Sequence, residues 1–234
     1  MTRHSISFVI PMFNEREAIE DSIEEVRIIA KALTDDYEII ISDDASTDGS
    51  GDIARRMSEK DANIHVVGMR ENTKFGGALA AGLKRAVKDI VIYTDADLPV
   101  SLLDIKKSLP MIEKADIVTA TSMIKKGENL KRKIISWGYN TLLQVLFRIR
   151  IKDVNSGYKI FRREVLEGMN LISKSPFVDA EIFINAKRKR AVIAEYPLIF
   201  RSRRQGASKI ARLSVIAGTF SDMLRFRFKL PDKS

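Results

Sequence analysis

Two acidic motifs carry the strongest chemical signal in this sequence. Asp95-Ala96-Asp97 directly follows the apolar run DIVIYT, and Asp43-Asp44 follows the run YEIIIS. Alternate residues of an extended turn can direct two carboxylates into one cleft, where Mg²⁺ or Mn²⁺ would bridge them to a diphosphate that they otherwise repel. An isolated Asp-x-Asp pattern also arises by chance. Its place after an apolar run, downstream of a second acidic motif, favours a metal site at Asp95 and Asp97.

The other acidic motif runs from Asp43 to Gly49, with the sequence DDASTDG. Adjacent carboxylates at an apolar edge repel each other, and here they can receive the hydroxyl and ring N–H groups of a nucleoside. The structural alternative is a loop of solvated acids in which Ser46 and Thr47 cap the helix that follows. Nucleoside binding is the favoured interpretation, and the capped loop stays open.

Two shorter motifs have both a structural and a functional interpretation. Pro11 ends the first apolar run, and Asn14 or Glu15 can then cap a helix or face a nucleotide. Gly76-Gly77 precedes an alanine-rich segment, whose first amides can approach phosphates. The same glycines would equally allow a helix to pack tightly on a sheet.

These motifs lie at the ends of apolar runs that alternate with helical patterns. Strands are predicted over residues 5–11, 37–42, 64–69, 89–94 and 116–121, and helices over 15–33, 47–60, 76–86 and 102–112. Such alternation predicts an α/β fold with a mainly parallel, twisted sheet flanked by helices. Ligands of such sheets bind at the carboxyl ends of the strands. We therefore expect Asn14, Asp43, Asp95 and Ser122 to lie along one edge.

Composition limits the chemistry further. The chain has 234 residues, of which 45% are hydrophobic, enough for one large α/β domain with appendages. It contains no cysteine, which excludes disulfides and cysteine-based metal sites. His4 and His65 are its only histidines and lie far apart in the sequence. A hard metal ion would therefore have to bind carboxylates.

The net charge of +9 is concentrated in residues 123–234. A basic half suggests an anionic partner, whether nucleic acid, phospholipid head groups or a phosphorylated substrate. Residues 131–151 and 208–230 combine Lys and Arg with aliphatic and aromatic residues over the length of a helix. Such helices can lie in a bilayer interface, or pack on the core with solvated charges.

No membrane-spanning helix is expected from the sequence. It contains no run of about 18 apolar residues. The apolar run near the N-terminus is short and ends at Pro11, which is typical of a buried strand and not of a signal peptide.

The order of the motifs resembles glycosyltransferase family 2 with the GT-A fold, and within it the polyprenyl-phosphate glycosyltransferases of the dolichyl-phosphate mannose synthase type. The resemblance extends from residue 5 to about residue 210. The matching residues are Pro11, Asn14, Glu15, Asp43, Asp44, Ser46, Asp48, Gly49, Gly76, Ala78, the run from Asp95 to Leu98, the run from Asp153 to Lys159, Arg203, Gly206, Ser208 and Lys209.

The resemblance implies roles for many of these positions, and also for Arg132 and Ser136, which fall where this group has residues near the acceptor phosphate. It implies contacts to a nucleoside-diphosphate sugar from Pro11, Asn14, Glu15, Asp43, Asp44, Ser46, Gly76, Asp95 and Ala96, and metal binding by Asp95 and Asp97. It implies contacts to an acceptor phosphate from Arg132, Ser136, Arg203 and Lys209. Asp97, Arg132, Asp153, Arg203 and Lys209 are the expected catalytic residues.

The expected acceptor decides whether a general base is needed. A lipid phosphate is already anionic near neutral pH, because its second pKa is about 6, and it mainly needs cations to position it. A carbohydrate hydroxyl would need a base, for which Asp153 and Asp179 are candidates. For Asp179 the structural alternative is a helix cap.

The sequence departs from the family pattern in three ways. Pro99 stands where relatives often have a metal-binding Gln, and Met123 where they often have a phosphate-binding Arg. Lys125 and Lys126 are candidate substitutes for that Arg. Relatives also often continue into transmembrane helices, which this sequence does not contain.

The resemblance therefore implies an inverting glycosyltransferase that moves a hexose onto polyprenyl phosphate, and the basic amphipathic segments predict that it acts at a membrane surface. GDP-mannose is the favoured donor by resemblance, and a UDP-sugar is the alternative. A soluble transferase acting on a carbohydrate hydroxyl also stays open. A nucleic-acid-binding protein is disfavoured because carboxylates repel phosphate backbones, so no nucleic acid partner is expected.

We expect a catalytic domain over residues 1–207, which includes the amphipathic segment 131–151. A basic amphipathic helix is expected over 208–234. The predicted location is cytoplasmic, peripheral on the cytoplasmic face of a membrane.

Overall fold

A seven-stranded sheet forms the centre of the computed structural model, which describes residues 4–123, 130–201 and 213–228. The strand order is β3-β2-β1-β4-β6-β5-β7, and β6 runs antiparallel to both of its neighbours. The other paired strands are parallel, so the predicted mainly parallel sheet is confirmed. The strands are β1 (Ile6–Met12), β2 (Tyr37–Asp43), β3 (Ile64–Gly68), β4 (Ile90–Thr94), β5 (Ile117–Ser122), β6 (Tyr158–Arg162) and β7 (Ile193–Leu198).

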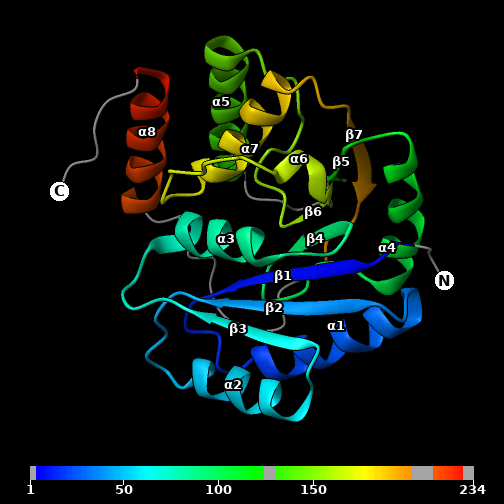
Figure 1. Ribbon diagram of the computed structural model, residues 1–234. Coiled ribbons are helices and arrows are strands. Elements are labelled where there is room, and N and C mark those ends of the chain that lie inside the picture. Colours follow the sequence, from blue (N-terminus) through cyan, green and yellow to red (C-terminus); the bar gives the residue numbers. More distant parts are fainter. Residues whose placement is uncertain (1–3, 124–129, 202–212, 229–234) are drawn as a thin grey trace.

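Helices cover both faces of the sheet, with α1 and α2 below it and α3 above it in Figure 1. Side chains alternate across a strand, so Phe8 and Ile10 of β1 join the core beside α1, whereas Val9 joins the core beside α3. The helices are α1 (Ile19–Leu33), α2 (Ser50–Lys60), α3 (Lys74–Arg85), α4 (Leu102–Ser108), the 3₁₀ helix η1 (Leu109–Glu113), α5 (Leu130–Phe147), α6 (Arg163–Leu166), α7 (Phe177–Arg188) and α8 (Leu213–Phe228).

Strand register brings the predicted motifs to one edge of the sheet. Met12 at the end of β1 lies opposite Asp43 at the end of β2, and Val9 lies opposite Tyr93 of β4. The loops that follow β1, β2 and β4 therefore start side by side. This confirms the expected convergence of Asn14, Asp43 and Asp95 at the carboxyl ends of parallel strands.

Helix starts differ from the sequence expectation. The predicted helix over 47–60 begins only at Ser50, and Gly49 occupies its N-cap with a left-handed φ of 90°. The structural alternative, in which Ser46 and Thr47 cap this helix, is wrong, because the N-cap is Gly49 and the Ser46 hydroxyl accepts a hydrogen bond from the Asn14 amide. The helix predicted over 102–112 is α4 followed by η1, whose first turn contains Pro110.

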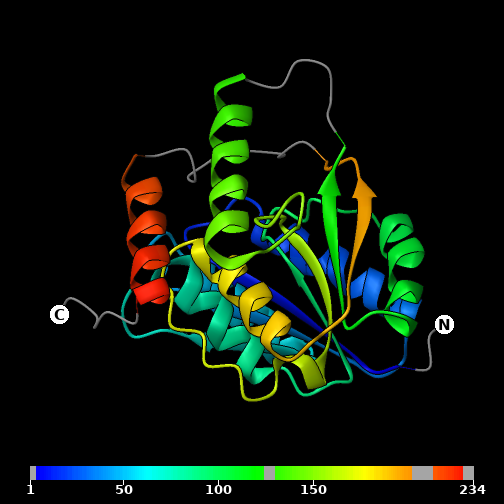
Figure 2. The ribbon, with the colours of Figure 1, turned by 90° about the horizontal axis from the view of Figure 1, so that it is seen from above.

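Between residue 150 and α8, the elements were not predicted from the sequence, whereas α8 lies within the amphipathic helix expected over 208–234. β6 returns antiparallel between β4 and β5, α7 packs on the same face as α3, and β7 extends the far edge. Figures 1 and 2 both show α5 and α8 as neighbours on one side of the sheet. Phe147 of α5 and Phe226 of α8 lie 6.1 Å apart, measured between ring centroids. Within the described residues, no helix has the length and apolar character needed to cross a bilayer.

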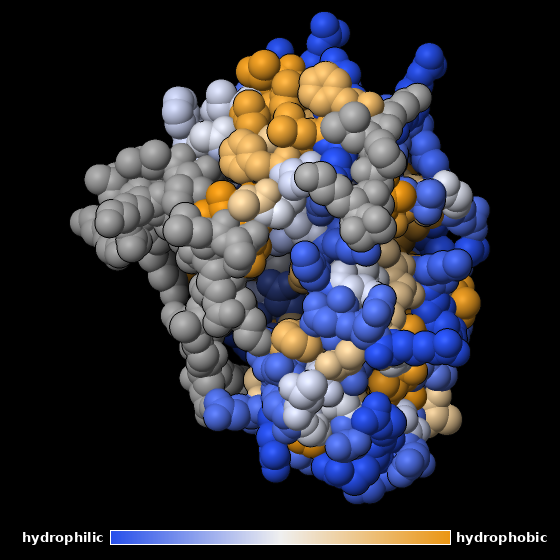
Figure 3. Space-filling model, turned by 90° about the vertical axis from the view of Figure 1, so that its left-hand side faces the viewer, coloured by the Kyte–Doolittle hydropathy of each residue, from blue (hydrophilic) through white to orange (hydrophobic). Residues whose placement is uncertain are grey.

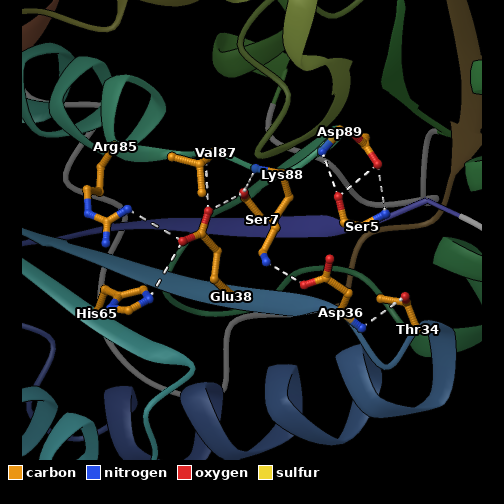
Figure 4. Close-up of polar contacts among 10 residues, drawn as sticks. All are labelled: Ser5, Ser7, Thr34, Asp36, Glu38, His65, Arg85, Val87, Lys88 and Asp89. Atoms are coloured by element: carbon orange, nitrogen blue, oxygen red, sulfur yellow. Dashed lines mark hydrogen bonds and ion pairs between the residues drawn. The ribbon is translucent and has the colours of Figure 1, made fainter.

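A buried carboxylate joins several elements at the opposite edge of the sheet (Figure 4). Glu38 of β2 is 3% exposed and accepts hydrogen bonds from the Ser7 hydroxyl at 2.6 Å and the Val87 amide at 2.9 Å. His65 of β3 and Arg85 of α3 each lie 3.6 Å from the same carboxylate. Glu38 thus connects β1, β2, β3 and the segment between α3 and β4.

We expect Glu38→Ala to lower the free energy of unfolding by about 2–4 kcal/mol, because a buried hydroxyl and a backbone amide lose a charged acceptor. Urea unfolding followed by circular dichroism measures this change. Glu59→Ala is the matched control, since Glu59 is exposed on α2, and it should change stability by less than about 0.5 kcal/mol. Equal effects of the two substitutions would contradict a structural role for Glu38.

Candidate active site

A cavity of about 940 Å³ opens at the carboxyl edge of the sheet. The loops after β1, β2 and β4 form one side, and the segment 172–176 together with α8 forms the other. Figure 3 looks onto this edge and shows a hollow with hydrophilic residues inside it. Of the predicted nucleotide-sugar residues, the cavity is lined by Pro11, Glu15, Asp44, Asp95 and Ala96.

Asn14 and Ser46 connect the loops after β1 and β2 by hydrogen bonds and do not line the cavity. Asn14 adopts a left-handed φ of 54°. Its amide donates to the Ser46 hydroxyl at 3.0 Å, and its Oδ1 accepts from the Thr47 amide at 2.8 Å. These bonds hold the loop after β1 against the loop after β2, so the two residues shape the cavity wall indirectly.

The adjacent acids Asp43 and Asp44 have different environments. Asp43 accepts a hydrogen bond from the Ser46 amide at 3.0 Å and does not line the cavity. Asp44 lines the cavity and accepts from the Thr73 amide at 2.6 Å and the Thr73 hydroxyl at 2.7 Å. Burial raises the pKa of Asp44, although the hydrogen bonds from Thr73 oppose that rise. Asp44 therefore fixes the start of α3 and is the member of the pair that a ligand can reach.

Gly76 allows α3 to pack closely against the chain that precedes α7. Its amide donates to the Lys174 carbonyl at 2.8 Å, and a Cβ at this position would lie only 2.1 Å from the Ser173 carbonyl oxygen. The amide is thus engaged by protein, and Gly76 does not line the cavity. The geometry supports the packing interpretation of this glycine.

The turn from Asp95 to Asp97 lies on the cavity floor and is held from two sides. The Tyr93 hydroxyl donates to Asp95 Oδ1 at 2.6 Å, and the Asp95 amide donates to the Gly157 carbonyl at 3.1 Å. A Cβ on Gly157 would lie 2.2 Å from Asp95 Oδ2, so any side chain there would displace the carboxylate. Leu98 closes the turn with a φ of 40°. Asp95, Ala96 and Asp97 all face the same cavity.

The donor set at this turn fits a cation that arrives with a phosphorylated ligand. Asp95 and Asp97 offer hard oxygen ligands. Across residues 4–123, 130–201 and 213–228, no group of three or more His, Cys, Asp and Glu side chains is arranged to hold a metal. Mg²⁺ commonly binds to one or two carboxylates and takes its other ligands from water and substrate phosphates. Pro99 has no side-chain oxygen to offer a metal ion, and its carbonyl accepts a hydrogen bond from the Arg201 amide at 3.0 Å.

A buried ion pair lies behind the Asp95 turn. Lys159 of β6 is fully buried, and its Nζ donates to Asp179 Oδ1 at 2.8 Å and to the Ser156 carbonyl at 2.5 Å. The same Nζ lies 5.1 Å from the centroid of the Tyr93 ring. Burial raises the pKa of Asp179 to about 6, the Lys159 ammonium opposes this rise, and the nearby Asp95 carboxylate adds to it. Asp179 also lines the cavity.

The expectation that Asp179 caps a helix is wrong. The N-cap of α7 is Pro176, and Asp179 lies within the helix with its side chain bonded to Lys159. Its neighbour Glu181 is fully buried and accepts the amides of Ile172 and Ser173, both at 2.9 Å. The two acids of α7 therefore fix the cavity floor and the segment 172–176.

The predicted acceptor residues are mostly beyond the described structure. Arg203 and Lys209 lie outside the described residues, as do Lys125 and Lys126. Arg132 and Ser136 belong to α5, but the description of side chains in that helix starts at Trp137. Asp153 is half-buried just before β6 and does not line the cavity, and Met123 is exposed at the end of β5.

One wall of the cavity was not predicted from the sequence. Val215, Gly218, Ser221 and Arg225 of α8 line it. Asp222, on the same face of α8, accepts the amides of Lys174 at 3.1 Å and of Ser175 at 2.8 Å, which fastens the helix to the segment 172–176. A contact between residues nearly 50 positions apart leaves no local pattern, so the sequence offered no signal for it.

Tyr93 was missed as a supporting residue, and Lys159 was named only as the end of a matched motif, without its role in an ion pair. Residues i and i+2 of an extended chain point the same way, which places the Tyr93 side chain on the side of Asp95. Lys159 interrupts the apolar strand YKIF, and a lysine at such a position is ordinarily solvated.

Comparisons with known proteins identify the family. The arrangement described above is that of an α/β protein whose paired carboxylates meet a deep cavity at the carboxyl ends of parallel strands. The family model of glycosyl transferase family 2 matches residues 7–169. The chain belongs to glycosyl transferase family 2.

Several curated relatives cover most of this chain. An undecaprenyl-phosphate mannosyltransferase of Micrococcus luteus is 25% identical over 87% of this chain and 86% of its own length. A dolichol-phosphate mannosyltransferase of Pyrococcus furiosus is 31% identical over 88% of this chain and 59% of its own. Glycosyltransferase AglD of Haloferax volcanii is 26% identical over 96% of this chain, which spans only 37% of that longer protein.

A solved structure confirms the fold. Glucosyl-3-phosphoglycerate synthase of Mycobacterium tuberculosis, in complex with Mn²⁺, UDP and glucosyl-3-phosphoglycerate, aligns with a TM-score of 0.74. The alignment covers 99% of this chain and 82% of that one, with 22% sequence identity. Identity at this level speaks for the fold alone, and it bears out the expected GT-A architecture.

We expect Lys159→Met to lower the free energy of unfolding by about 3–5 kcal/mol, because it leaves the Asp179 carboxylate buried without its counter-charge. Lys159→Met combined with Asp179→Leu should recover most of that loss, since an apolar pair needs no compensation. Urea unfolding of the wild type and the variants measures both changes. A double variant no more stable than the single one would contradict charge compensation as the role of Lys159.

Proposed function

We propose that this chain transfers a hexose from a nucleoside diphosphate to a polyprenyl phosphate, with a divalent cation held by Asp95 and Asp97. The observation that carries the proposal is that Asp44, which follows β2, and Asp95 and Asp97, which follow β4, line the same cavity. A cluster of carboxylates there is unfavourable for an anionic ligand until a cation compensates it. Membership of glycosyl transferase family 2 supports the reaction class.

The reaction separates a sugar from a diphosphate at its anomeric carbon. The transition state of glycosyl transfer resembles an oxocarbenium ion, while negative charge accumulates on the leaving diphosphate. A bound Mg²⁺ or Mn²⁺ would act as a Lewis acid and template for that leaving group. The Tyr93 hydroxyl and the backbone at Gly157 hold the Asp95 carboxylate in place. The inversion implied by the family resemblance is part of the proposal.

The choice of a phosphate acceptor is supported by the names of the relatives. Three of them are an undecaprenyl-phosphate mannosyltransferase, a dolichol-phosphate mannosyltransferase and an undecaprenyl-phosphate 4-deoxy-4-formamido-L-arabinose transferase. The first two names favour mannose. The third name carries a different sugar, and solved neighbours were captured with UDP-glucose, so GDP-mannose is the first donor to test and UDP-sugars are the alternative.

A carbohydrate hydroxyl acceptor is the second candidate. It would need a general base at the cavity, and Asp179 is placed there. The direct bond between Asp179 and Lys159 favours a structural role for this carboxylate instead. A phosphate oxygen, which is already anionic, requires no such base.

A membrane surface is the proposed setting. Trp137 and Val145 of α5 are 72% and 71% exposed, and Phe228 of α8 is 62% exposed. Figure 3 shows apolar residues gathered at the upper end of the face that carries the hollow. Exposed aromatic and aliphatic residues on a basic protein fit the interface of an anionic bilayer. A peripheral position on the cytoplasmic face stays a prediction from the sequence.

We expect Asp97→Ala to reduce sugar transfer by about 1,000-fold, which corresponds to about 4 kcal/mol of lost transition-state stabilisation. The assay offers radiolabelled GDP-mannose, UDP-glucose and other nucleotide sugars to the full chain with polyprenyl phosphate, with Mn²⁺ or with EDTA. Asp35→Ala, an exposed acid far from the cavity, should transfer at the wild-type rate. Unchanged turnover of Asp97→Ala, or full activity in EDTA, would remove the metal site from the proposal.

The chain should float with vesicles that contain anionic phospholipid, and the substitutions Trp137→Ser and Val145→Ser together should reduce that binding by more than about tenfold, because burial of a large apolar side chain contributes about 1.5–3 kcal/mol. Leu103→Ser removes another exposed apolar residue, 59% exposed, from α4, on the other side of the molecule (Figure 1), and should leave flotation unchanged. Absence of flotation by the wild type would favour the soluble transferase.

A further inference from the structure

The described lining of the cavity is strongly acidic, which makes its few cations informative. It includes Glu15, Asp44, Asp95, Asp97 and Asp179, whereas its cations within the described residues are Lys74, Lys174 and Arg225. A metal ion on the Asp95 turn would compensate a donor diphosphate. An anionic acceptor that enters the same cavity needs positive charge of its own.

Two of these three cations, Lys174 and Arg225, lie close to Asp222 on the wall opposite the sheet. The Asp222 carboxylate accepts the backbone amides of Lys174 and Ser175. Arg225 follows Asp222 by three residues, which places it on the same face of α8, one turn further along. Both Lys174 and Arg225 line the cavity. Asp222 lines the cavity as well, so Lys174 and Arg225 against Asp222 leave this wall with one net positive charge, while the sheet edge carries the metal-binding carboxylates.

The same helix presents apolar residues to solvent directly beside its cavity face. At 3.6 residues per turn, Leu224 lies about 100° around the helix from Arg225, and Phe220 lies slightly beyond it. Leu224 and Phe220 are 46% and 43% exposed. The opposite side of α8 is occupied, because Met223 is fully buried and Phe226 packs against the aromatic rings of α5 and α7.

We propose that Arg225, together with Lys174, binds the phosphate of the acceptor, and that Leu224 and Phe220 contact the apolar chain attached to that phosphate. A phosphate at Arg225 inside the cavity would bring its chain out over the adjacent exposed stripe. The inference rests on the proposed function, which supplies an acceptor that is a phosphate with a long apolar chain. The match to the family model ends at residue 169, so that model assigns no role to this helix.

The test compares Arg225→Gln with Arg227→Gln in the full chain. Arg227 is an exposed arginine of the same helix and does not line the cavity, so its substitution removes the same charge without touching the site. Initial rates are measured while polyprenyl phosphate or nucleotide sugar is varied. Arg225→Gln should raise the KM for polyprenyl phosphate by about tenfold, the equivalent of one charge-assisted hydrogen bond of about 1.5 kcal/mol. Its KM for the donor should be unchanged.

The control variants separate binding from folding. Arg227→Gln should leave both KM values unchanged, and Arg225→Lys should recover part of the acceptor affinity because it keeps the charge. An Arg225→Gln variant that behaves like Arg227→Gln, or that raises the KM for the donor equally, would overturn the inference while leaving the proposed function intact. Wild-type chain that transfers sugar to no phosphate acceptor would instead overturn the proposed function and the inference with it.

A second pair of measurements identifies the source of the phosphate. Leu224→Ser should raise the KM for a long-chain prenyl phosphate and leave the KM for a chainless phosphate acceptor, such as 3-phosphoglycerate, unchanged. Leu103→Ser is the control for a lost exposed leucine. Two outcomes would contradict the role of the apolar stripe. One is a wild-type KM for the chainless acceptor that is as low as the KM for the prenyl phosphate. The other is a Leu224→Ser variant whose KM for the prenyl phosphate is unchanged.

Discussion

The position of the Asp95 carboxylate is the constraint on which the rest of the site depends. It is held by the Tyr93 hydroxyl on one oxygen and closely approached by the backbone of Gly157 on the other. Tyr93 belongs to β4, and Gly157 directly precedes β6, which lies next to β4 in antiparallel order. The insertion of an antiparallel strand into an otherwise parallel sheet thus has a chemical consequence: it brings the turn before β6 against the end of β4.

Burying charge beneath such a site requires compensation, and the fold provides it locally. Lys159 enters from β6 and meets Asp179 from α7, so that a fully buried ammonium finds a carboxylate at hydrogen-bond distance. Desolvation makes a pair of this kind costly to break and only weakly stabilising compared with an apolar pair. Its position directly behind the Asp95 turn suggests that it is retained for the order it imposes on the cavity floor. The second acid of α7, Glu181, orders the next segment by accepting two backbone amides.

Sequence patterns predicted the first half of the fold because its information is local. Strand periods and the acids after two apolar runs were readable within a few residues, although β1 continues through Pro11 to Met12 and α2 begins only after Gly49. The failures have a common physical cause, which is that a side chain can be used by a distant partner. The Ser46 hydroxyl accepts a hydrogen bond from the Asn14 amide and caps no helix. Lys159 is buried in an ion pair with Asp179 of α7, and Asp222 accepts an amide of the segment that precedes α7. The partner of each of these side chains depends on tertiary contacts, which cannot be inferred from the neighbouring residues in the sequence.

The division of charge between the two walls of the cavity follows from these contacts. Parallel strands end together and so collect their acidic loops at one edge, where each added carboxylate raises the cost of bringing in an anion. Helix α8 comes from the far end of the chain and is fastened by Asp222, which accepts two amides, and by Phe226, which packs against α5 and α7. This attachment leaves Arg225 on the cavity face and its apolar neighbours outside. Under the proposed function both substrates are anionic, and cationic groups on two separate walls would allow each phosphate group to be held in its own position.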